Sequence, residues 1–350
     1  MTASVGIVAT GAQTCLGLSA APSAAAVRAG VSGVCEHPHF RQRSGSAVCG
    51  ALAAYLDPAL TGSTRLAALA LPALEEACTA LSGAPEGNRQ IPLYVGVSEL
   101  RPGFGPGDVR ELEHEFRRIK RRPIAFSPVV VLPNGHAAGL LALKMGMDAI
   151  QEGVCDACVV GGVDSYFHVD TIQWLDEHRQ LAGETSRSGF VPGEGAGFCV
   201  LMSSRAAERL GIPELLSVLT VSTGREACLI KTADTCLGEG LTGAVGAALD
   251  SLPSSALPID DVICDINGER YRGEEWAFVS LKLSQHFADV TGYQSPAECW
   301  GDVGAASGPL FAMLACQAET RGYNKGPSTM VWASSESGLR AAAVLRQAVV

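Results

Sequence analysis

The chain has 350 residues, of which 47% are hydrophobic and 18% are charged, and its formal net charge is −10. Such an apolar composition excludes a disordered protein and predicts a large globular body with an ample core. The acidic balance disfavours a nucleic-acid or anionic-membrane binder, because the summed field repels phosphate groups. The twelve scattered cysteines favour reduced thiols in a cytoplasmic protein, and neither an export signal nor a membrane-spanning segment is expected.

Apolar runs and helical periodicity predict alternating strands and helices in the first part of the chain. In chain order these are a strand at 5–10, helices at 20–29 and 64–82, a strand at 91–97, a helix at 108–122, a strand at 128–132, a helix at 136–151 and a strand at 158–162. Two stretches rich in Ser, Gly or Pro, 31–48 and 99–108, are predicted to be surface loops.

The alternation of predicted strands and helices starts again after Gly211. This repetition predicts two pseudo-repeated βαβα halves, 1–211 and 212–350. The second half is expected to contain strands at 215–222, 261–265, 329–333 and 342–346, and helices at 238–250, from 274, and after the Gly-rich turn at 301–308. This order predicts an α/β body of mostly parallel strands covered by helices, with function at loops near the carboxyl ends of the strands.

The most specific motif is Ser188 to Leu201, which reads Ser-Gly-Phe-Val-Pro-Gly-Glu-Gly-Ala-Gly-Phe-Cys-Val-Leu and is followed by Ala-Ala-Glu-Arg-Leu-Gly. A phosphate-binding loop is disfavoured because no Lys-Ser/Thr pair follows. This stretch resembles the Asp-Gly-Phe-Val-x-Gly-Glu-Gly-Ala-Gly strand-turn-strand segment of the β-ketoacyl synthases, which are the condensing enzymes of the thiolase fold. The resemblance implies a thiolase-like, layered αβαβα body. It also implies that the backbone is shaped by Gly139, Gly193, Glu194, Gly195, Gly197 and Gly301.

The resemblance also implies four catalytic positions: a Cys at the head of a buried helix, two His and a Lys. Counted from Pro128, the Cys position falls on His136. The two His positions fall on Asn267 and Asp302, and the Lys position falls on Ala297. An alternative register matches residues 127–146 to the preceding helix of the family and deletes the strand and turn, and neither register supplies a cysteine.

Without a thiolate and an imidazole pair, condensation and decarboxylation have no support, so a catalytically degenerate binding protein is predicted. The preferred interpretation is an adaptor or chaperone, such as one in a bacterial secretion-effector cluster. Two alternatives stay open: a partner subunit of an active ketosynthase, and a residual acyl hydrolase or acyltransferase using His136 and Asp302. In all three, His136, Asn267 and Asp302 are expected to converge.

Two surfaces are candidates for partner binding. The resemblance implies dimerisation through the strand at 128–132, as a homodimer or as a heterodimer with a related subunit. The charged helix ends in a basic run that suits either a solvated helix or docking of an acyl carrier protein or effector polypeptide. That run comprises Arg117, Arg118, Lys120, Arg121 and Arg122. No cofactor or metal is predicted, since Cys155-x-x-Cys158 lacks a second pair.

Overall fold

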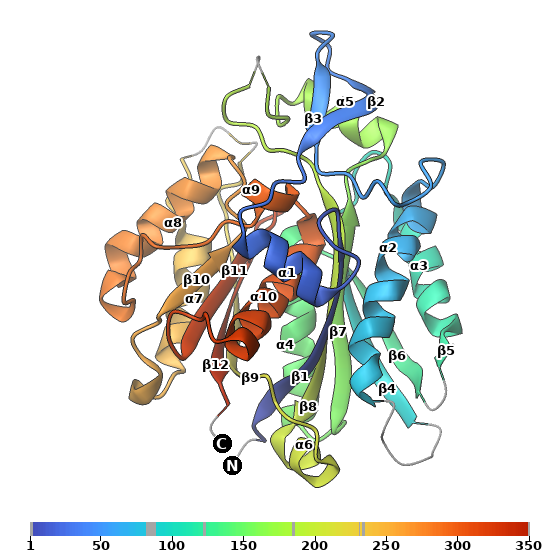
Figure 1. The fold of residues 1–350 in the computed structure, drawn as a ribbon. Helices are drawn as coiled ribbons and strands as arrows, with labels where there is room; N and C mark the ends of the chain where they lie inside the picture. The colour runs from blue at the N-terminus through green and yellow to red at the C-terminus, as the bar shows by residue number, and fades with distance from the viewer. Residues whose placement is uncertain are drawn as a thin grey trace.

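A computed structural model describes residues 3–81, 89–121, 124–183, 186–230, 232 and 235–348. Within these ranges ten strands form one continuous sheet (Figure 1). The first half contributes β1 (Val5–Thr14), β4 (Arg89–Val97), β5 (Lys120–Arg121), β6 (Ile124–Pro133), β7 (Ala157–Ser165) and β8 (Glu194–Ser203). The second half contributes β9 (Leu216–Arg225), β10 (Asp261–Cys264), β11 (Ser328–Ser334) and β12 (Leu339–Gln347). The order across the sheet is β10-β11-β12-β9-β1-β8-β7-β4-β6-β5.

The sheet is mixed, so the prediction of mostly parallel strands was wrong. Parallel pairs join β4 to β6, β4 to β7 and β10 to β11. The other pairings are antiparallel, including the β1–β9 contact that connects the two halves. Strand direction could not be predicted from the sequence, because a strand covered on both faces is apolar throughout whether its neighbours are parallel or antiparallel.

When the strands of the two halves are counted as separate β layers, six helices complete a five-layered body. The middle layer holds α4 (Ala138–Gln151) and α10 (Ser307–Arg321), which contact each other and strands of both halves. One outer face is covered by α2 (Gly62–Ala77) and α3 (Pro106–Arg118), and the opposite face by α7 (Glu239–Asp250) and α8 (Arg270–Leu283). This is the αβαβα arrangement that the resemblance implied. None of the described helices is both long and apolar enough to cross a membrane.

Smaller elements account for the remaining differences from the expected elements. The segment 31–48, expected to be a loop, supplies β2 (Cys35–Arg41), which pairs with β3 (Ala47–Gly50) as a separate hairpin. Its side chains are mostly exposed and polar, so no apolar alternation marks it. The other short helices are α1 (Ala20–Arg28), α5 (Val169–Glu177), α6 (Ser204–Leu210), α9 (Ala297–Trp300) and the 3₁₀ turns η1 (Cys78–Leu81), η2 (Gly135–Ala137), η3 (Ser254–Ala256), η4 (Ser284–His286) and η5 (Gly304–Ala306).

The glycine-rich motif forms the start of β8, which is buried along its whole length between β1 and β7. A Cβ added to Gly197 would lie 2.9 Å from the backbone nitrogen of Leu310, so the missing side chain lets α10 approach the sheet. The carboxylate of Glu194 accepts hydrogen bonds from Arg65 at 2.6 Å, and both side chains are buried. The motif is therefore a structural anchor between the sheet and its two helical neighbours, α2 and α10.

Candidate functional site

The site lies at the head of the central helix α4. His136 is in η2, the turn that leads from β6 into α4, and is only 6% exposed. Its Nε2 atom lies 2.9 Å from each carboxylate oxygen of Asp302. Asn267, in the loop after β10, donates its amide Nδ2 hydrogen to Oδ2 of Asp302. The expected convergence of these three side chains is thus confirmed, whereas Ala297 opens the short α9 and offers only a methyl group.

Two further residues, which were not predicted from the sequence, complete the cluster. The hydroxyl of Tyr166 donates to Oδ1 of Asp302 at 3.1 Å and lies 3.3 Å from Nε2 of His136. Nη2 of Arg272 lies 3.0 Å from the same Nε2 atom. Tyr166 directly follows β7, a position at the end of a predicted strand that could have marked it. Arg272 carried no such signal, because a charged residue in the first turn of a helix normally faces solvent.

Arg272 is fully buried because acidic side chains surround it. Its Nη1 atom donates to Asp265 and, at 2.7 Å, to the carbonyl of Ser334. Its Nε atom donates to Glu269 at 3.2 Å. Burial raises the pKa of Asp265 and of Glu269, while the neighbouring acids hold the pKa of Arg272 well above its usual value against the effect of burial. The guanidinium of Arg272 is therefore paired with the carboxyl groups of Asp265 and Glu269.

The two central groups form an ion pair. Burial opposes ionisation of Asp302, but His136 and Arg272 outweigh it and hold the pKa of Asp302 well below its usual range. The backbone N–H of Gly304 also donates to Oδ1 at 2.7 Å. Burial and Arg272 lower the pKa of His136, but the contact with Asp302 outweighs them and raises it above the usual value. The carboxylate thus stays charged and fixes one ring nitrogen of the imidazole.

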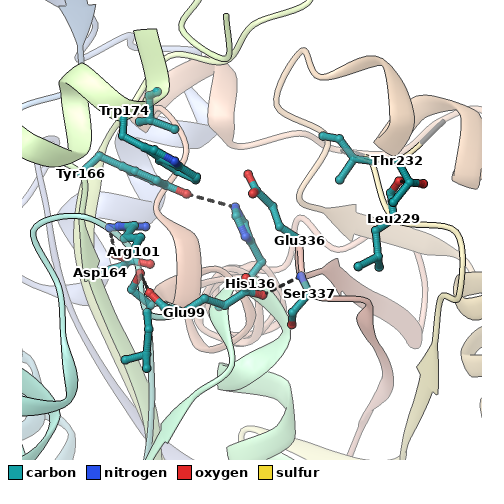
Figure 2. Close-up of a pocket in the computed structure, with 15 residues that line it drawn as sticks. Glu99, Arg101, His136, Asp164, Tyr166, Trp174, Leu229, Thr232, Glu336 and Ser337 are labelled. Atoms are coloured by element: carbon teal, nitrogen blue, oxygen red, sulfur yellow. Dashed lines mark hydrogen bonds and ion pairs between the residues drawn. The ribbon is translucent and has the colours of Figure 1, made fainter. Parts of the chain in front are cut away.

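A cavity of about 310 Å³ opens beside this cluster (Figure 2). Its lining includes Glu99, Arg101, His136, Tyr166, Trp174 and Glu336. The guanidinium of Arg101 stacks on the Tyr166 ring, 4.2 Å from its centroid, and Nη2 donates to Asp164 at 2.7 Å. The buried Nε atom of Arg101 has no hydrogen-bond partner among the described residues. The cavity therefore combines charged groups with an aromatic wall.

Hydrogen bonds across the cavity connect the two halves of the chain. Oε1 of Glu99, in the loop after β4, accepts the backbone N–H of Ser337, in the β11–β12 loop, at 3.0 Å. The hydroxyl of Ser335 in the same loop accepts the N–H of Ala137 at 2.9 Å, next to His136. The head of α4 is therefore enclosed by loops from both halves, and residues 135–141 include no cysteine.

The basic run at the end of α3 is only partly described. Arg117 pairs with Glu113 at 2.6 Å, and Arg118 lies 3.6 Å from Glu115. All four side chains belong to one helix and are at least 31% exposed, so these pairs reduce the positive charge that a partner would meet. The side chains of Lys120 and Arg121, and the whole of Arg122, lie outside the described residues.

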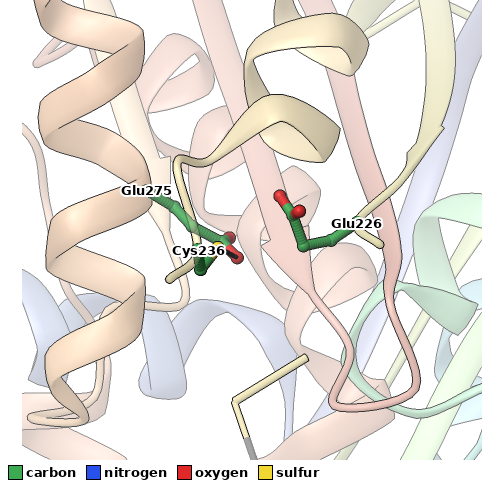
Figure 3. Close-up of side chains that lie close together, drawn as sticks. All are labelled: Glu226, Cys236 and Glu275. Carbon is green, nitrogen blue, oxygen red and sulfur yellow. Dashed lines mark hydrogen bonds between the residues drawn. The ribbon is translucent and has the colours of Figure 1, made fainter. Parts of the chain in front are cut away.

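A second group of ionisable side chains lies in the other half of the molecule, outside the site (Figure 3). One potential ligand atom each from Glu226, Cys236 and Glu275 lies within 4.8 Å of the others. Glu275 already accepts from Nε of Arg340 at 2.9 Å, and Glu226 accepts the backbone N–H of Gly240 at 2.9 Å. Burial, together with the two carboxylates, raises the pKa of Cys236 to about 11. The cluster is therefore explained as a hydrogen-bonded network with a protonated thiol.

Comparisons with known proteins agree with this arrangement. The family described as "Beta-ketoacyl synthase, N-terminal domain" matches residues 127–207. The tetracenomycin polyketide synthase ketoacyl synthase alpha subunit of Streptomyces glaucescens is 30% identical over 179 residues, which cover 47% of this chain and 42% of that protein. The chain spans about half the length of the curated relatives it matches.

Two solved structures match nearly the whole chain. One is a type II PKS acyl-carrier protein in complex with its ketosynthase bound to the hexaketide, with a TM-score of 0.80 and 16% identity over 99% of this chain and 100% of that chain. The other is the ishigamide ketosynthase/chain length factor, with a TM-score of 0.78 and 19% identity over 100% of both chains. At these identities the matches establish the fold.

The layered fold, with a buried central helix that begins at a polar cluster between the two halves, is the fold of these ketosynthase structures. Residues 127–207 are similar to the N-terminal domain of the β-ketoacyl synthases. This match contains both the glycine-rich motif of β8 and the head of α4.

Proposed function

We propose that this chain is the non-condensing partner subunit of a heterodimer with a related, active ketosynthase. The observation that carries the proposal is the His136–Asp302 pair at the head of α4. In the preferred register, His136 stands where the resemblance expects the cysteine nucleophile. An imidazole there cannot form the acyl thioester on which condensation depends.

The residues at the expected histidine and lysine positions also support a non-condensing subunit. Condensation with loss of carboxylate develops negative charge on an oxygen, which requires donors or cations nearby. Asp302 places a carboxylate at one of the expected histidine positions, with a pKa well below the usual range, and the nearby cation Arg272 is already paired with Asp265 and Glu269. Ala297 supplies no charge at the position expected for the lysine. We therefore assign the condensing chemistry to the partner.

An open sheet edge supports pairing with a related subunit. Beyond its contact with β5 at Ile124 and Ala125, β6 has only β4 as a hydrogen-bonded neighbour in the described ranges. Val130, Val131 and Leu132 on this strand are half-buried apolar residues. An exposed edge with apolar side chains is a template for pairing with another strand. This is the strand through which the resemblance implies dimerisation.

The comparisons support the partner-subunit interpretation better than the adaptor interpretation. One structural neighbour is described as a ketosynthase/chain length factor and another as an acyl-carrier protein in complex with its ketosynthase. An acyl carrier protein is accordingly the second partner that we propose. Twelve free thiols are consistent with assembly in the reducing cytoplasm.

Affinity purification of the tagged chain from its source organism, followed by mass spectrometry, tests the proposal. We expect a ketosynthase with an intact cysteine, two histidines and a lysine to co-purify in equal amount. Recovery of an unrelated toxin-like polypeptide instead would support the adaptor interpretation. Recovery of a homodimer alone would also contradict a heterodimeric partner subunit.

A further inference from the structure

We infer that His136 is a general base whose Nδ1 atom faces the cavity, that Asp302 is its positioning residue, and that the cavity hydrolyses short acyl esters or thioesters. This activity goes beyond the proposed partner role and does not depend on it. The inference rests on which nitrogen of His136 is engaged. Every polar contact within hydrogen-bond distance between His136 and another described side chain involves Nε2.

The ring orientation is fixed by the groups that hold Asp302. Its Oδ1 atom accepts from the N–H of Gly304 at 2.7 Å, and Asn267 and Tyr166 donate to the carboxylate as well. In the tautomer that we assign, Nε2 donates to the Asp302 carboxylate at 2.9 Å and the lone pair of the neutral ring is on Nδ1; the Arg272 guanidinium, which can only donate, is then a neighbouring charge and not a hydrogen-bond partner of Nε2. His136 lines the cavity, and Figure 2 shows its ring between Tyr166 and Glu336.

The charges that face the imidazole come from several elements. Arg272 on α8 approaches Nε2 at 3.0 Å, and Asp265 at the end of β10 and Glu269 before α8 pair with that guanidinium. Asp302 and the Tyr166 hydroxyl complete the set. The carboxylate of Asp302 outweighs Arg272, so the base is stronger than an ordinary histidine. It is active when unprotonated, and the hydrolysis rate is therefore expected to rise with pH.

The reaction needs only water as co-substrate. Nδ1 of His136 takes a proton from water while the oxygen bonds to the acyl carbon, and the carbonyl electron pair moves onto oxygen. Collapse of this oxyanion re-forms the C=O bond and breaks the bond to sulfur or oxygen. The leaving group takes the proton back from Nδ1, so the products are a carboxylic acid and a thiol or alcohol. Arg101, which lines the same cavity, is the cation available to stabilise the oxyanion.

The size and lining of the cavity limit the substrate class. A volume of about 310 Å³ is at the small end of ligand pockets, which suits a short acyl chain. Trp174, Leu175 and Leu229 provide apolar surface on the wall. Glu99 lies in the same lining, and its carboxylate disfavours a substrate that carries its own negative charge. We therefore expect uncharged acyl groups to be preferred over malonyl-type groups.

The test compares wild type with His136→Gln, Asp302→Asn and His114→Gln, using 4-nitrophenyl acetate and S-acetyl-N-acetylcysteamine from about pH 5 to 9. His114 is an exposed histidine on α3 and serves as the control for unspecific imidazole catalysis. We expect His136→Gln to lose about 10²-fold in kcat/KM, as is typical for loss of a general base. Asp302→Asn should shift the midpoint of the pH profile downward, and His114→Gln should match wild type.

Equal rates for wild type and His136→Gln, or no hydrolysis above buffer by wild type, would overturn the inference. Circular dichroism checks that each variant is folded. Should His136→Gln not fold, ¹⁵N NMR of wild type decides the question: an unprotonated Nδ1 in the neutral ring supports the inference, and a protonated Nδ1 with a bare Nε2 overturns it. Loss of hydrolysis with retained ketosynthase binding would leave the partner role unaffected.

Discussion

His136 and Asp302 come from opposite halves of the chain, yet Nε2 of His136 lies 2.9 Å from both carboxylate oxygens of Asp302. Asp302 is 3% exposed and His136 is 6% exposed, so the pair is shielded from solvent. In such surroundings a charged group depends on its partner, because water cannot replace the lost interaction. The contact therefore joins the two halves across the head of α4.

Removing one member of this pair should destabilise the protein strongly. For Asp302→Asn we expect the free energy of unfolding to fall by about 3–5 kcal/mol, since breaking a buried pair leaves the other charge uncompensated. Urea denaturation followed by circular dichroism measures the change. The exposed Asp170, whose side chain is 60% accessible, provides the control Asp170→Asn with a change near zero. A loss no larger than that of the control would contradict a strong buried pair.

The same pair predicts how stability depends on pH. Folding raises the pKa of His136, so this group contributes stability that is fully present below its unfolded pKa and is lost as pH rises through the folded value. Between these two values, the free energy of unfolding should fall with pH in wild type and fall less in His136→Gln. Denaturation curves at a series of pH values above the usual histidine pKa measure the slope. Identical slopes in the two proteins would refute the raised pKa of His136.

Sequence patterns located most elements, and the family resemblance located the three polar side chains that meet in the site. The helix at 64–82 was found because apolar residues recur at helical spacing, and the glycine-rich motif gave the strand and turn of β8. Strand direction was missed, since it depends on which strands pair and not on their composition. The boundary that we propose between the halves falls at Gly211, which ends α6 in a left-handed conformation.

Arg272 and Arg101 show why the remainder of the site was out of reach. Arg101 is a buried cation whose acidic partner, Asp164, lies far along the chain, whereas Arg272 is buried although its partner Asp265 is near in sequence. Burial of a cation is created by tertiary contact, so a single sequence gives no signal for it. Tyr166 is an intermediate case, because it follows a predicted strand but has neither a charge nor a motif to mark it.

Restoring a thiol at the head of α4 should not restore condensation. In His136→Cys the new side chain would lie beside Asp302, whose negative charge disfavours the thiolate. The two histidine positions would still hold Asn267 and Asp302. We expect no release of carbon dioxide from a malonyl thioester and slow alkylation by iodoacetamide. Carbon dioxide release above the wild-type level would contradict the proposal that the whole catalytic set is missing.

The crossing of the two central helices depends on Gly139. A Cβ at this position would lie 2.3 Å from Cδ of Pro309 and 2.7 Å from the carbonyl oxygen of Ala305, so α4 and α10 would have to move apart. For Gly139→Ala we expect a loss of about 1–3 kcal/mol in the free energy of unfolding. Gly243 on α7 is the matched control, because no atom lies within 4 Å of its added Cβ. Gly243→Ala should leave stability unchanged or raise it, and equal losses in both variants would contradict a packing role for Gly139.

The edge strand β6 is the surface through which we expect the subunits to associate. Val131 is half-buried on this strand, and a lysine there would place a charge within an apolar strand-to-strand interface. We expect Val131→Lys to weaken subunit association at least tenfold in analytical ultracentrifugation while the monomer stays folded. Val154, which is 70% exposed in the turn after α4, provides the control Val154→Lys. Unchanged association in Val131→Lys would exclude the β6 edge as the interface, because a buried lysine without a partner cannot be accommodated at no cost.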